Sequence, residues 1–271
     1  MKRTKNDRAL RFYSEVLGLE RIHYGLWLPE DELSLENLKK AQIRYEDLLI
    51  EQIPSDAKSI LDVGCGTGVM SSKLKELGYN VEGLSPDINQ QEVFATKVDA
   101  PFHFCCFEEF TPQKKYDVII MSESAQYIPL PLLFKTAAQA LTGSGVLIIS
   151  DYFVNKEATG KMAKSGHRYE LFLAEAESNN FAVMKNEDIT DGITKTLDIG
   201  KLYVDKILLT VNIFSERFVI RHPHVTRLAL WLGRNKIKSG KEEMQLIDSK
   251  QFKANKAYRL IVFRSGGEGV S

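Results

Sequence analysis

The stretch ILDVGCGTG, residues 60–68, decides how this chain folds. Three apolar residues surround one carboxylate, Asp62, and glycines follow at positions 64, 66 and 68. A short apolar run bounded by glycine indicates a buried strand. Alternate glycines directly after a strand let the backbone approach a ligand closely, and a following helix presents unpaired N–H groups there. The stretch therefore predicts a strand, a ligand-binding turn and a helix.

The glycine spacing excludes two common nucleotide loops. A dinucleotide fingerprint, G-x-G-x-x-G, needs its third glycine one residue later, at the position of Val69. A phosphate-binding P-loop ends in Gly-Lys followed by Ser or Thr, and the run GTGVM contains no lysine. We therefore expect a ligand other than a dinucleotide or a nucleoside triphosphate.

Short apolar strands and helical patterns alternate after this loop. We expect strands over 59–64, 79–84, 102–107, 116–121, 145–150, 181–190 and 256–264, and helices over 68–78, 129–145 and 167–180. This alternation predicts a largely parallel sheet covered by helices on both faces. In such sheets the ligand lies at the carboxyl ends of the strands, near the point where the strand order reverses.

The run LDVGCGTG, with an acid two residues before its first glycine, resembles the first motif of the class I S-adenosylmethionine-dependent methyltransferases. YDVIIMSESAQYI, residues 116–128, and LTGSGVLIIS, residues 141–150, resemble the fourth and fifth strand motifs of that family, so the resemblance covers at least residues 59–151. It implies a Rossmann-like seven-stranded mixed sheet whose last strand is antiparallel, and S-adenosyl-L-methionine as cofactor. That cofactor carries a positive sulfonium and no phosphate, which suits a roomy loop rich in carbonyl groups.

The resemblance also implies the residues that bind the cofactor. Asp62 is expected to organise the methionine end, with loop capping as the alternative role. Ser85 stands where many members carry an acid for the ribose hydroxyls, although Ser85 and Pro86 are equally suited to open the next helix. Cys106 replaces an adenine-contacting acid and leaves Phe107 as a wall for the ring. The complete expected set is Tyr24, Asp62, Gly64, Cys65, Gly66, Gly68, Leu84, Ser85, Cys106, Phe107 and Ser122.

Two segments are candidates for acceptor binding and chemistry. An acceptor hydroxyl or ammonium needs a base, and Glu123, directly after the expected fourth strand, is a candidate for it or for stabilising a cation. Tyr127 is expected to orient the acceptor. The segment HYGLW, residues 23–27, resembles the aromatic cap of small-molecule relatives, in which Tyr24 would close over the cofactor and His23 and Trp27 would line the acceptor pocket. Ordinary loop bonding for Glu123 and simple packing for the aromatic rings are the alternatives.

A long insertion, residues 190–251, separates the last two expected strands. Its apolar residues recur at helical spacing, four, four, three and four apart: Tyr203, Ile207, Val211, Phe214 and Phe218. Residues 201–241 carry nine basic and two acidic side chains, a local charge of +7, in a chain whose 36 basic and 36 acidic residues cancel. We expect a helical lid that faces an acidic or lipid-like acceptor or transiently contacts an anionic membrane surface. The alternative is a solvated helix face. His222 and His224 are candidate catalytic bases in this lid, with a structural turn as their alternative role.

Composition sets the broad class. The 44% hydrophobic content favours a globular chain, organised as one compact unit with a helical cap over 1–52, a core over 53–189 and 252–265, and the lid over 190–251. The cysteines, Cys65, Cys105 and Cys106, form neither a disulfide framework nor a zinc pattern, so we expect a cytoplasmic protein without a metal. No window contains the apolar run that a membrane span needs. Nucleic-acid partners are not expected, because the net charge is zero and no NPPY-like motif is present.

The leading interpretation is methyl transfer to a small, partly apolar metabolite, on oxygen, nitrogen or carbon. A cyclopropane-synthase-like reaction on acyl chains is one alternative. A non-catalytic relative that binds the cofactor or a partner is another, because Ser85 and Cys106 replace acids that the family usually carries. The sequence leaves the acceptor, the pathway and the oligomeric state open.

Overall fold

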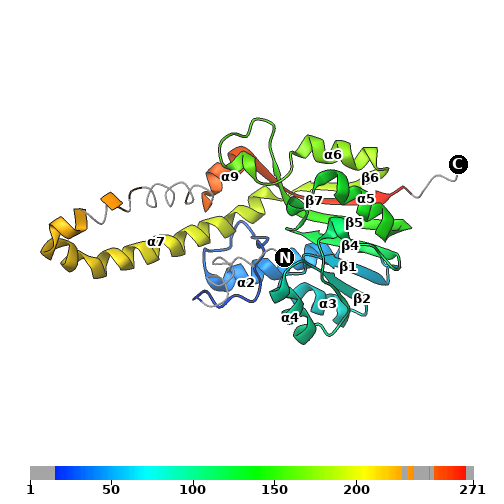
Figure 1. Cartoon of the computed structure of the whole chain (residues 1–271), viewed down its shortest axis with the longest axis horizontal. Coiled ribbons are helices and arrows are strands. Elements are labelled where there is room, and N and C mark those ends of the chain that lie inside the picture. The colour runs from blue at the N-terminus through cyan, green and yellow to red at the C-terminus, as the bar shows by residue number, and fades with distance from the viewer. Residues whose placement is uncertain (1–15, 228–230, 233, 235–243, 245–246, 267–271) are drawn as a thin grey trace.

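The computed structural model describes residues 16–227, 231–232, 234, 244 and 247–266. Its centre is a seven-stranded sheet with the order β3-β2-β1-β4-β5-β7-β6 (Figure 1). The strands are β1 (Ser59–Val63), β2 (Asn80–Leu84), β3 (Phe102–His103), β4 (Tyr116–Ser122), β5 (Leu141–Val154), β6 (Phe181–Asp188) and β7 (Lys256–Ser265). Only β7 is antiparallel to its neighbours, β5 and β6. The predicted Rossmann-like mixed sheet with an antiparallel last strand is confirmed.

The strand order reverses between β1 and β4. From β1 the chain builds outward through β2 and β3, and it then crosses back to place β4 on the other side of β1. The carboxyl ends of these two central strands therefore open a crevice, the usual ligand position in an open α/β sheet. The glycine loop follows β1 directly, so the topology places it at this crevice.

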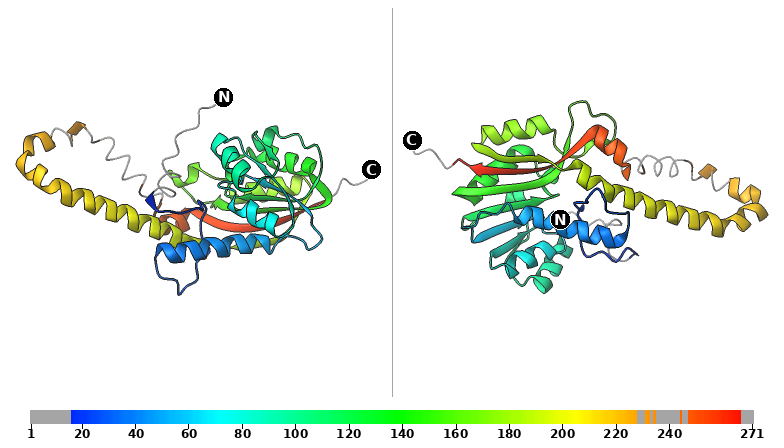
Figure 2. Two further views of the ribbon diagram at one scale, coloured as in Figure 1. Left: turned by 90° about the horizontal axis from the view of Figure 1, so that it is seen from below. Right: turned by 180° about the vertical axis from the view of Figure 1, so that it is seen from behind.

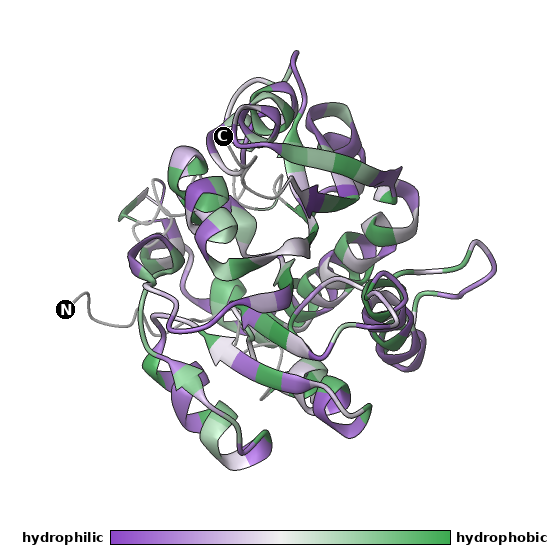
Figure 3. Ribbon diagram, turned by 90° about the vertical axis from the view of Figure 1, so that its right-hand side faces the viewer, coloured by the Kyte–Doolittle hydropathy of each residue, from purple (hydrophilic) through white to green (hydrophobic). Residues whose placement is uncertain are grey.

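One face of the sheet is covered by α5 (Leu130–Ala140) and α6 (Tyr169–Ser178). Successive strand residues point to opposite faces, and on this face Ile119 of β4 and Phe263 of β7 belong to one buried cluster with Phe134 and Phe172 of the two helices. The rings of Phe134 and Phe172 meet edge to face with centroids 5.0 Å apart. In Figure 3 the strands carry hydrophobic residues between the flanking helices.

The opposite face is covered by α2 (Leu35–Ile50), α3 (Val69–Glu76), the first turns of α7 (Thr190–Arg221) and α9 (Ser249–Asn255). Tyr45 and Leu49 of α2 join Ile120 and Ile148 of the sheet in a second buried cluster. Within the expected N-terminal cap, 16 of its 52 residues therefore form a helix packed on the sheet. Residues 16–34 of that cap run before α2, and residues 1–15 lie outside the described part.

Two strands differ from their predicted bounds by more than two residues. The strand expected over 102–107 is reduced to β3, because the chain turns at Cys106 into the short 3-10 helix η2 (Phe107–Glu109). The fifth strand begins at Leu141 rather than at 145. Leu141 pairs with Tyr116 and Val146 pairs with Val118, so a register shift accommodates the extra residues between them. The LTGSG run thus belongs to the strand and not to the end of the preceding helix.

The insertion between β6 and β7 is largely one helix, α7, of 32 residues. Six side chains in its first ten residues are buried against the body: Thr190, Ile193, Thr194, Thr196, Leu197 and Ile199. The remainder extends away from the sheet in all the views of Figures 1 and 2. The described part of the insertion is helical, as expected, but it projects outward and does not fold back over the glycine loop. Lys236, Lys238 and Lys241 lie outside the described residues.

No helix in the described part of the chain is long and apolar enough to cross a membrane.

Candidate functional site

The glycine loop adopts backbone angles that side chains disfavour. Gly64, Gly66 and Gly68 have φ values of +75°, +54° and +70°. A Cβ atom on Gly64 would lie 2.6 Å from the Cβ of Ser124, and one on Gly68 would lie 2.9 Å from Val98 Cγ2. These two positions therefore need glycine for space as well as for conformation. Gly66 has more room, since its Cβ would lie 3.7 Å from Ile22 Cδ1.

A cavity of about 490 Å³ opens beside this loop at the carboxyl edge of the sheet. Such a volume lies in the range of small-molecule sites. Eleven of the predicted site residues line it: Asp62, Gly64, Cys65, Gly66, Leu84, Ser85, Cys106, Phe107, Ser122, Glu123 and Tyr127. The cavity thus brings together residues from β1, β2, the β3–η2 turn and the loop after β4. Gly68 is not among the lining residues, because it begins α3 and packs against Val98.

Asp62 makes a contact of the kind expected for its alternative role, loop capping. Its carboxylate accepts a hydrogen bond from Ser71 in α3, which ties the end of β1 to the helix behind the loop. It is 1% exposed, and burial raises its pKa to about 6. Asp62 also lines the cavity.

The residues after β2 do not begin the next helix at Ser85 and Pro86, which was one expected arrangement. Asp87 is the N-cap of α4 (Ile88–Lys97), and its side chain accepts from the Asn89 N–H at 2.8 Å. Ser85 and Pro86 therefore do not open that helix. Ser85 is 3% exposed, and its Oγ accepts from the Asp87 N–H at 3.1 Å. Both Ser85 and Asp87 line the cavity, as does Gln90, whose side-chain oxygen accepts from the Gly66 N–H at 3.1 Å.

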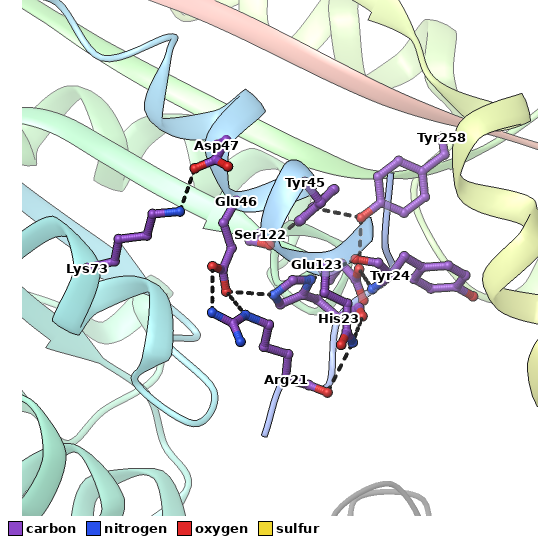
Figure 4. Close-up of polar contacts among 11 residues, drawn as sticks. Arg21, His23, Tyr24, Tyr45, Glu46, Asp47, Lys73, Ser122, Glu123 and Tyr258 are labelled. Carbon is purple, nitrogen blue, oxygen red and sulfur yellow. Dashed lines mark hydrogen bonds and ion pairs between the residues drawn. The ribbon is translucent and has the colours of Figure 1, made fainter. Parts of the chain in front are cut away.

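Glu123 occupies an unusual position directly after β4. Its φ of +57° is left-handed, a conformation that a non-glycine residue adopts at a cost of roughly 1–3 kcal/mol. The Oε1 atom of Glu123 accepts from the Tyr24 N–H at 2.7 Å and from the Tyr258 hydroxyl at 3.0 Å (Figure 4). Among the described residues no donor is bonded to Oε2. Burial raises the pKa of this carboxyl above its usual value.

Tyr24 acts through its backbone and not as the expected ring over the cavity. Its N–H holds Glu123, while its ring packs against Phe252 and Tyr258 at centroid distances of 6.4 and 5.6 Å. Tyr24 is not among the lining residues; Arg21, Ile22 and His23 of the same segment are. Trp27, also expected in the pocket, is buried in a separate cluster and its Nε1 donates to Thr196 Oγ1 at 2.9 Å. Packing is therefore the role of Trp27.

A charged group beside the cavity escaped prediction. Glu46 of α2 is fully buried and accepts from Arg21 Nε at 2.7 Å and Nη2 at 3.2 Å. Its Oε1 also lies 3.2 Å from His23 Nε2, and His23 Nδ1 lies 2.7 Å from the Tyr24 carbonyl oxygen. Burial raises the pKa of Glu46, but the bonds from His23 and Arg21 outweigh it and hold that pKa below its usual value. Because both ring nitrogens of His23 face oxygen acceptors, His23 is a poor candidate for a base.

A chain of hydroxyl groups supports Glu123 from behind. The Tyr258 hydroxyl bonds to the Tyr45 hydroxyl at 2.9 Å, and the latter lies 3.1 Å from Ser122 Oγ (Figure 4). The two tyrosine side chains come from β7 and α2, and both are fully buried. Glu123 is thus fixed by residues from three distant parts of the sequence.

His222 and His224 lie far from this cavity. His222 follows the last residue of α7, and both histidines are exposed. The helix carries them away from the sheet (Figure 2), and neither lines the cavity. Tyr127, by contrast, lines the rim of the cavity, and 78% of its surface is exposed. Among the described residues no group of three or more His, Cys, Asp or Glu is arranged to hold a metal ion.

Comparison with known proteins identifies similar sequences and folds. The profile of a family described as "Methyltransferase domain" matches residues 38–184, just over half of the 271 residues. A ubiquinone biosynthesis O-methyltransferase of Rickettsia typhi is 25% identical over 197 residues, which cover 65% of this chain and 80% of that protein.

Solved structures share the fold over nearly the whole chain. A putative sarcosine dimethylglycine methyltransferase from Galdieria sulphuraria has a TM-score of 0.72 at 16% identity, covering 96% of this chain and 99% of that one. A geranyl diphosphate C-methyltransferase from Streptomyces coelicolor, solved with S-adenosyl-L-homocysteine, has a TM-score of 0.66 at 15% identity over 96% of this chain and 94% of that one.

Proposed function

The chain belongs to the family of S-adenosylmethionine-dependent methyltransferases, and from this premise we propose that it methylates a small, partly apolar acceptor bound beside Glu123. The observation that carries the proposal is the placement of Glu123. Its strained backbone and two hydrogen bonds fix one carboxylate oxygen, while the other has no bonded donor among the described residues. Backbone strain that the surrounding residues hold in place beside a cavity is typical of functional sites.

The residues of the cavity fit the cofactor. The glycine loop leaves room that a Cβ atom would fill, and the Asp62 and Glu123 carboxylates suit a ligand with a positive centre. We assign Asp62 and the loop to the methionine end, Ser85 with Asp87 to the ribose, and Cys106 with Phe107 to the adenine. Ser122 and Leu84 complete the walls. When bound, the cofactor supplies an electrophilic methyl group.

Glu123 is assigned the proton transfer. A hydroxyl or ammonium acceptor must lose a proton as it is methylated, and a base works best when its pKa approaches the working pH. Burial moves the pKa of Glu123 in that direction. Tyr127, at the rim of the cavity, is assigned the orientation of the acceptor. His222 and His224 receive no part in the chemistry, because they lie at the far end of α7.

An oxygen acceptor is the favoured case. The Rickettsia relative is named as an O-methyltransferase of ubiquinone biosynthesis, which supports a hydroxyl acceptor. Apolar residues beside Glu123, such as Ile128 and Ile22, also suit such an acceptor. Free cysteines, among them Cys105 and Cys106, support a cytoplasmic setting.

Two measurements test the proposal in sequence. Calorimetry with S-adenosylmethionine should give saturable binding. Absence of binding would contradict both enzymatic interpretations, methyl transfer and the cyclopropane-synthase-like reaction. A radiolabelled methyl donor is then offered with pools of phenols, amines and acyl lipids. Label in the phenol pool is the expected result; label in the acyl lipids alone would favour the cyclopropane-type alternative. Cofactor binding without label in any pool would favour a non-catalytic relative.

A further inference from the structure

The α7 arm, defined as residues 200–227, projects from the same edge of the sheet as the cavity. Strands β6 and β1 are both parallel to β5 in direction, so α7, which follows β6, starts at the carboxyl edge where the glycine loop lies. A helix of 32 residues is about 48 Å long. Its fully buried side chains lie in its first third, and the arm continues outward beyond the N-terminal segment (Figure 1).

The buried row of α7 continues along the arm. Ile193 and Thr196 are buried against the body, and Tyr203 packs partly on the N-terminal segment. At steps of three and four residues the same row then presents Ile207 at 43% exposed, Phe214 at 83% and Phe218 at 55%. This row would be buried if a partner lay on it.

Further apolar side chains are exposed on the other sides of the arm. Residues between 207 and 225 include ten large hydrophobic side chains that are more than 40% exposed: Ile207, Leu208, Leu209, Val211, Ile213, Phe214, Phe218, Val219, Ile220 and Val225. Single exposed hydrophobic residues are ordinary, but so many on one projecting helix indicate an interaction surface. A solvated helix face therefore does not account for the arm.

Basic side chains border the apolar row. At 100° per residue, Lys206, Arg217 and Arg221 fall along one edge of it, whereas Asp205 and Glu216 fall on the opposite side of the helix. Asp205 is moreover paired with Lys201 at 2.8 Å. The sequence from 201 to 241 carries +7 in a chain of zero net charge, so the other residues carry 0 − 7 = −7.

This charge distribution indicates which kind of partner binds the arm. Two copies joined through their arms would bring together two segments that each carry five basic and two acidic residues, a net charge of +3, which disfavours self-association there. An anionic bilayer instead attracts the basic edge and accepts the apolar row into its interfacial region. We infer that the α7 arm docks on the surface of an anionic lipid bilayer.

Vesicle flotation of the full chain tests the inference. We expect the protein to float with vesicles of equimolar phosphatidylcholine and phosphatidylglycerol, to float much less with phosphatidylcholine alone, and to be released by added salt. Replacing two arm phenylalanines, Phe214→Ser with Phe218→Ser, should weaken partitioning by about tenfold or more. Reversing two charges, Arg217→Glu with Arg221→Glu, should weaken it to a similar degree.

Matched controls lie on the body. Leu171 in α6 is 59% exposed, so Leu171→Ser removes an exposed apolar side chain away from the arm. Lys135→Glu with Lys156→Glu reverses two exposed charges away from it. These variants should float like the original protein, and all variants should retain cofactor binding by calorimetry, which separates loss of docking from loss of folding.

Several outcomes would overturn the inference. They are no flotation with the anionic vesicles, equal flotation with neutral ones, or an equal effect of the body and arm variants. A concentration-dependent dimer that the phenylalanine pair abolishes, in a protein that does not float, would assign the arm to a second copy instead. The inference does not rest on the proposed acceptor, since vesicle binding is measured without methyl transfer.

Discussion

Glu123 is the residue on which the proposed chemistry depends. Both of its hydrogen bonds, from the Tyr24 N–H and the Tyr258 hydroxyl, arrive at the same oxygen, Oε1. A glutamine can keep that oxygen and place its amide nitrogen at the other position. Substitution by glutamine therefore removes the charge and the base while leaving the geometry.

We expect Glu123→Gln to lower the methyl-transfer rate by about a hundredfold or more, because a positioned general base contributes on this scale. Cofactor affinity by calorimetry should change little, and thermal stability should stay equal or rise, since a buried charge is removed. Tyr258→Phe, which deletes one bond to Oε1, is the matched control and should reduce the rate less. A Glu123→Gln enzyme with the original rate would exclude Glu123 as the base.

Asp62 gives a prediction about cofactor binding and pH. Its pKa is raised to about 6, so it loses its negative charge as the pH falls through that value. Affinity for the positively charged cofactor should then fall by about tenfold between pH 7.5 and pH 5, as expected for loss of a nearby opposite charge. Calorimetry across this range provides the measurement. Asp62→Asn should bind weakly at every pH, and a pH-dependent Asn variant would assign the effect to another group.

Site residues that belong to one local sequence pattern could be predicted, whereas those that meet only in the fold could not. Asp62 and the glycines belong to one strand-turn-helix pattern and Ser85 directly follows the next strand, so their places followed from the local sequence pattern. Arg21 and Glu46 meet only because a loop packs on α2, 25 positions along the chain. One signal was available: Glu46 falls on the apolar face of α2 beside Tyr45 and Leu49, where a charge needs a partner.

At the scale of the elements, the turn between β1 and α3 contains two glycines, Gly64 and Gly66, that differ in the space around them. Gly64 and Gly66 both have positive φ, so an alanine at either position is strained by about 1 kcal/mol or more. Only at Gly64 does the added Cβ also collide with Ser124. The two substitutions are therefore matched in backbone strain and differ in space.

Gly64→Ala should destabilise the protein by about 2 kcal/mol more than Gly66→Ala, as expected for forced overpacking at a buried turn. Urea unfolding of both variants measures the difference. Gly64→Ala should also lose cofactor binding, because the loop must move away from Ser124. Equal unfolding free energies for the two variants would mean that the turn relaxes without cost.

Element identities were predictable where periodicity was strong, and boundaries were not. The strands at 59–63, 80–84 and 116–122 match their apolar runs closely. The fifth strand extends from Leu141 because pairing with Tyr116 outweighs the poor strand propensity of its glycines. The helix α7 was visible in its spacing, but its outward direction depends on where packing against the body stops, which spacing alone does not encode.

At the scale of the whole molecule, buried carboxylates set the pH dependence of folding. Asp151, at the end of β5, is 1% exposed, and burial raises its pKa to about 8. Glu82 behaves in the opposite way: burial raises its pKa, but bonds from Lys114, Tyr116 and His103 outweigh this and lower it to about 2. The two groups therefore act in different pH windows.

Stability should be greatest near pH 4 and should fall on both sides. Between about pH 4 and pH 8 the unfolded chain has lost the Asp151 proton that the folded chain keeps, so folding weakens as the pH rises, by a total on the order of 6 kcal/mol. Below about pH 4 the unfolded chain gains the Glu82 proton first, so stability falls as the pH drops. Urea unfolding from pH 3 to pH 9 measures both limbs. Asp151→Asn should be less stable at pH 5, because the side chain accepts N–H bonds from Gln126 and Tyr152 through separate oxygens, yet its profile should be flatter above pH 5. An unchanged slope in that variant would assign the alkaline limb to other groups.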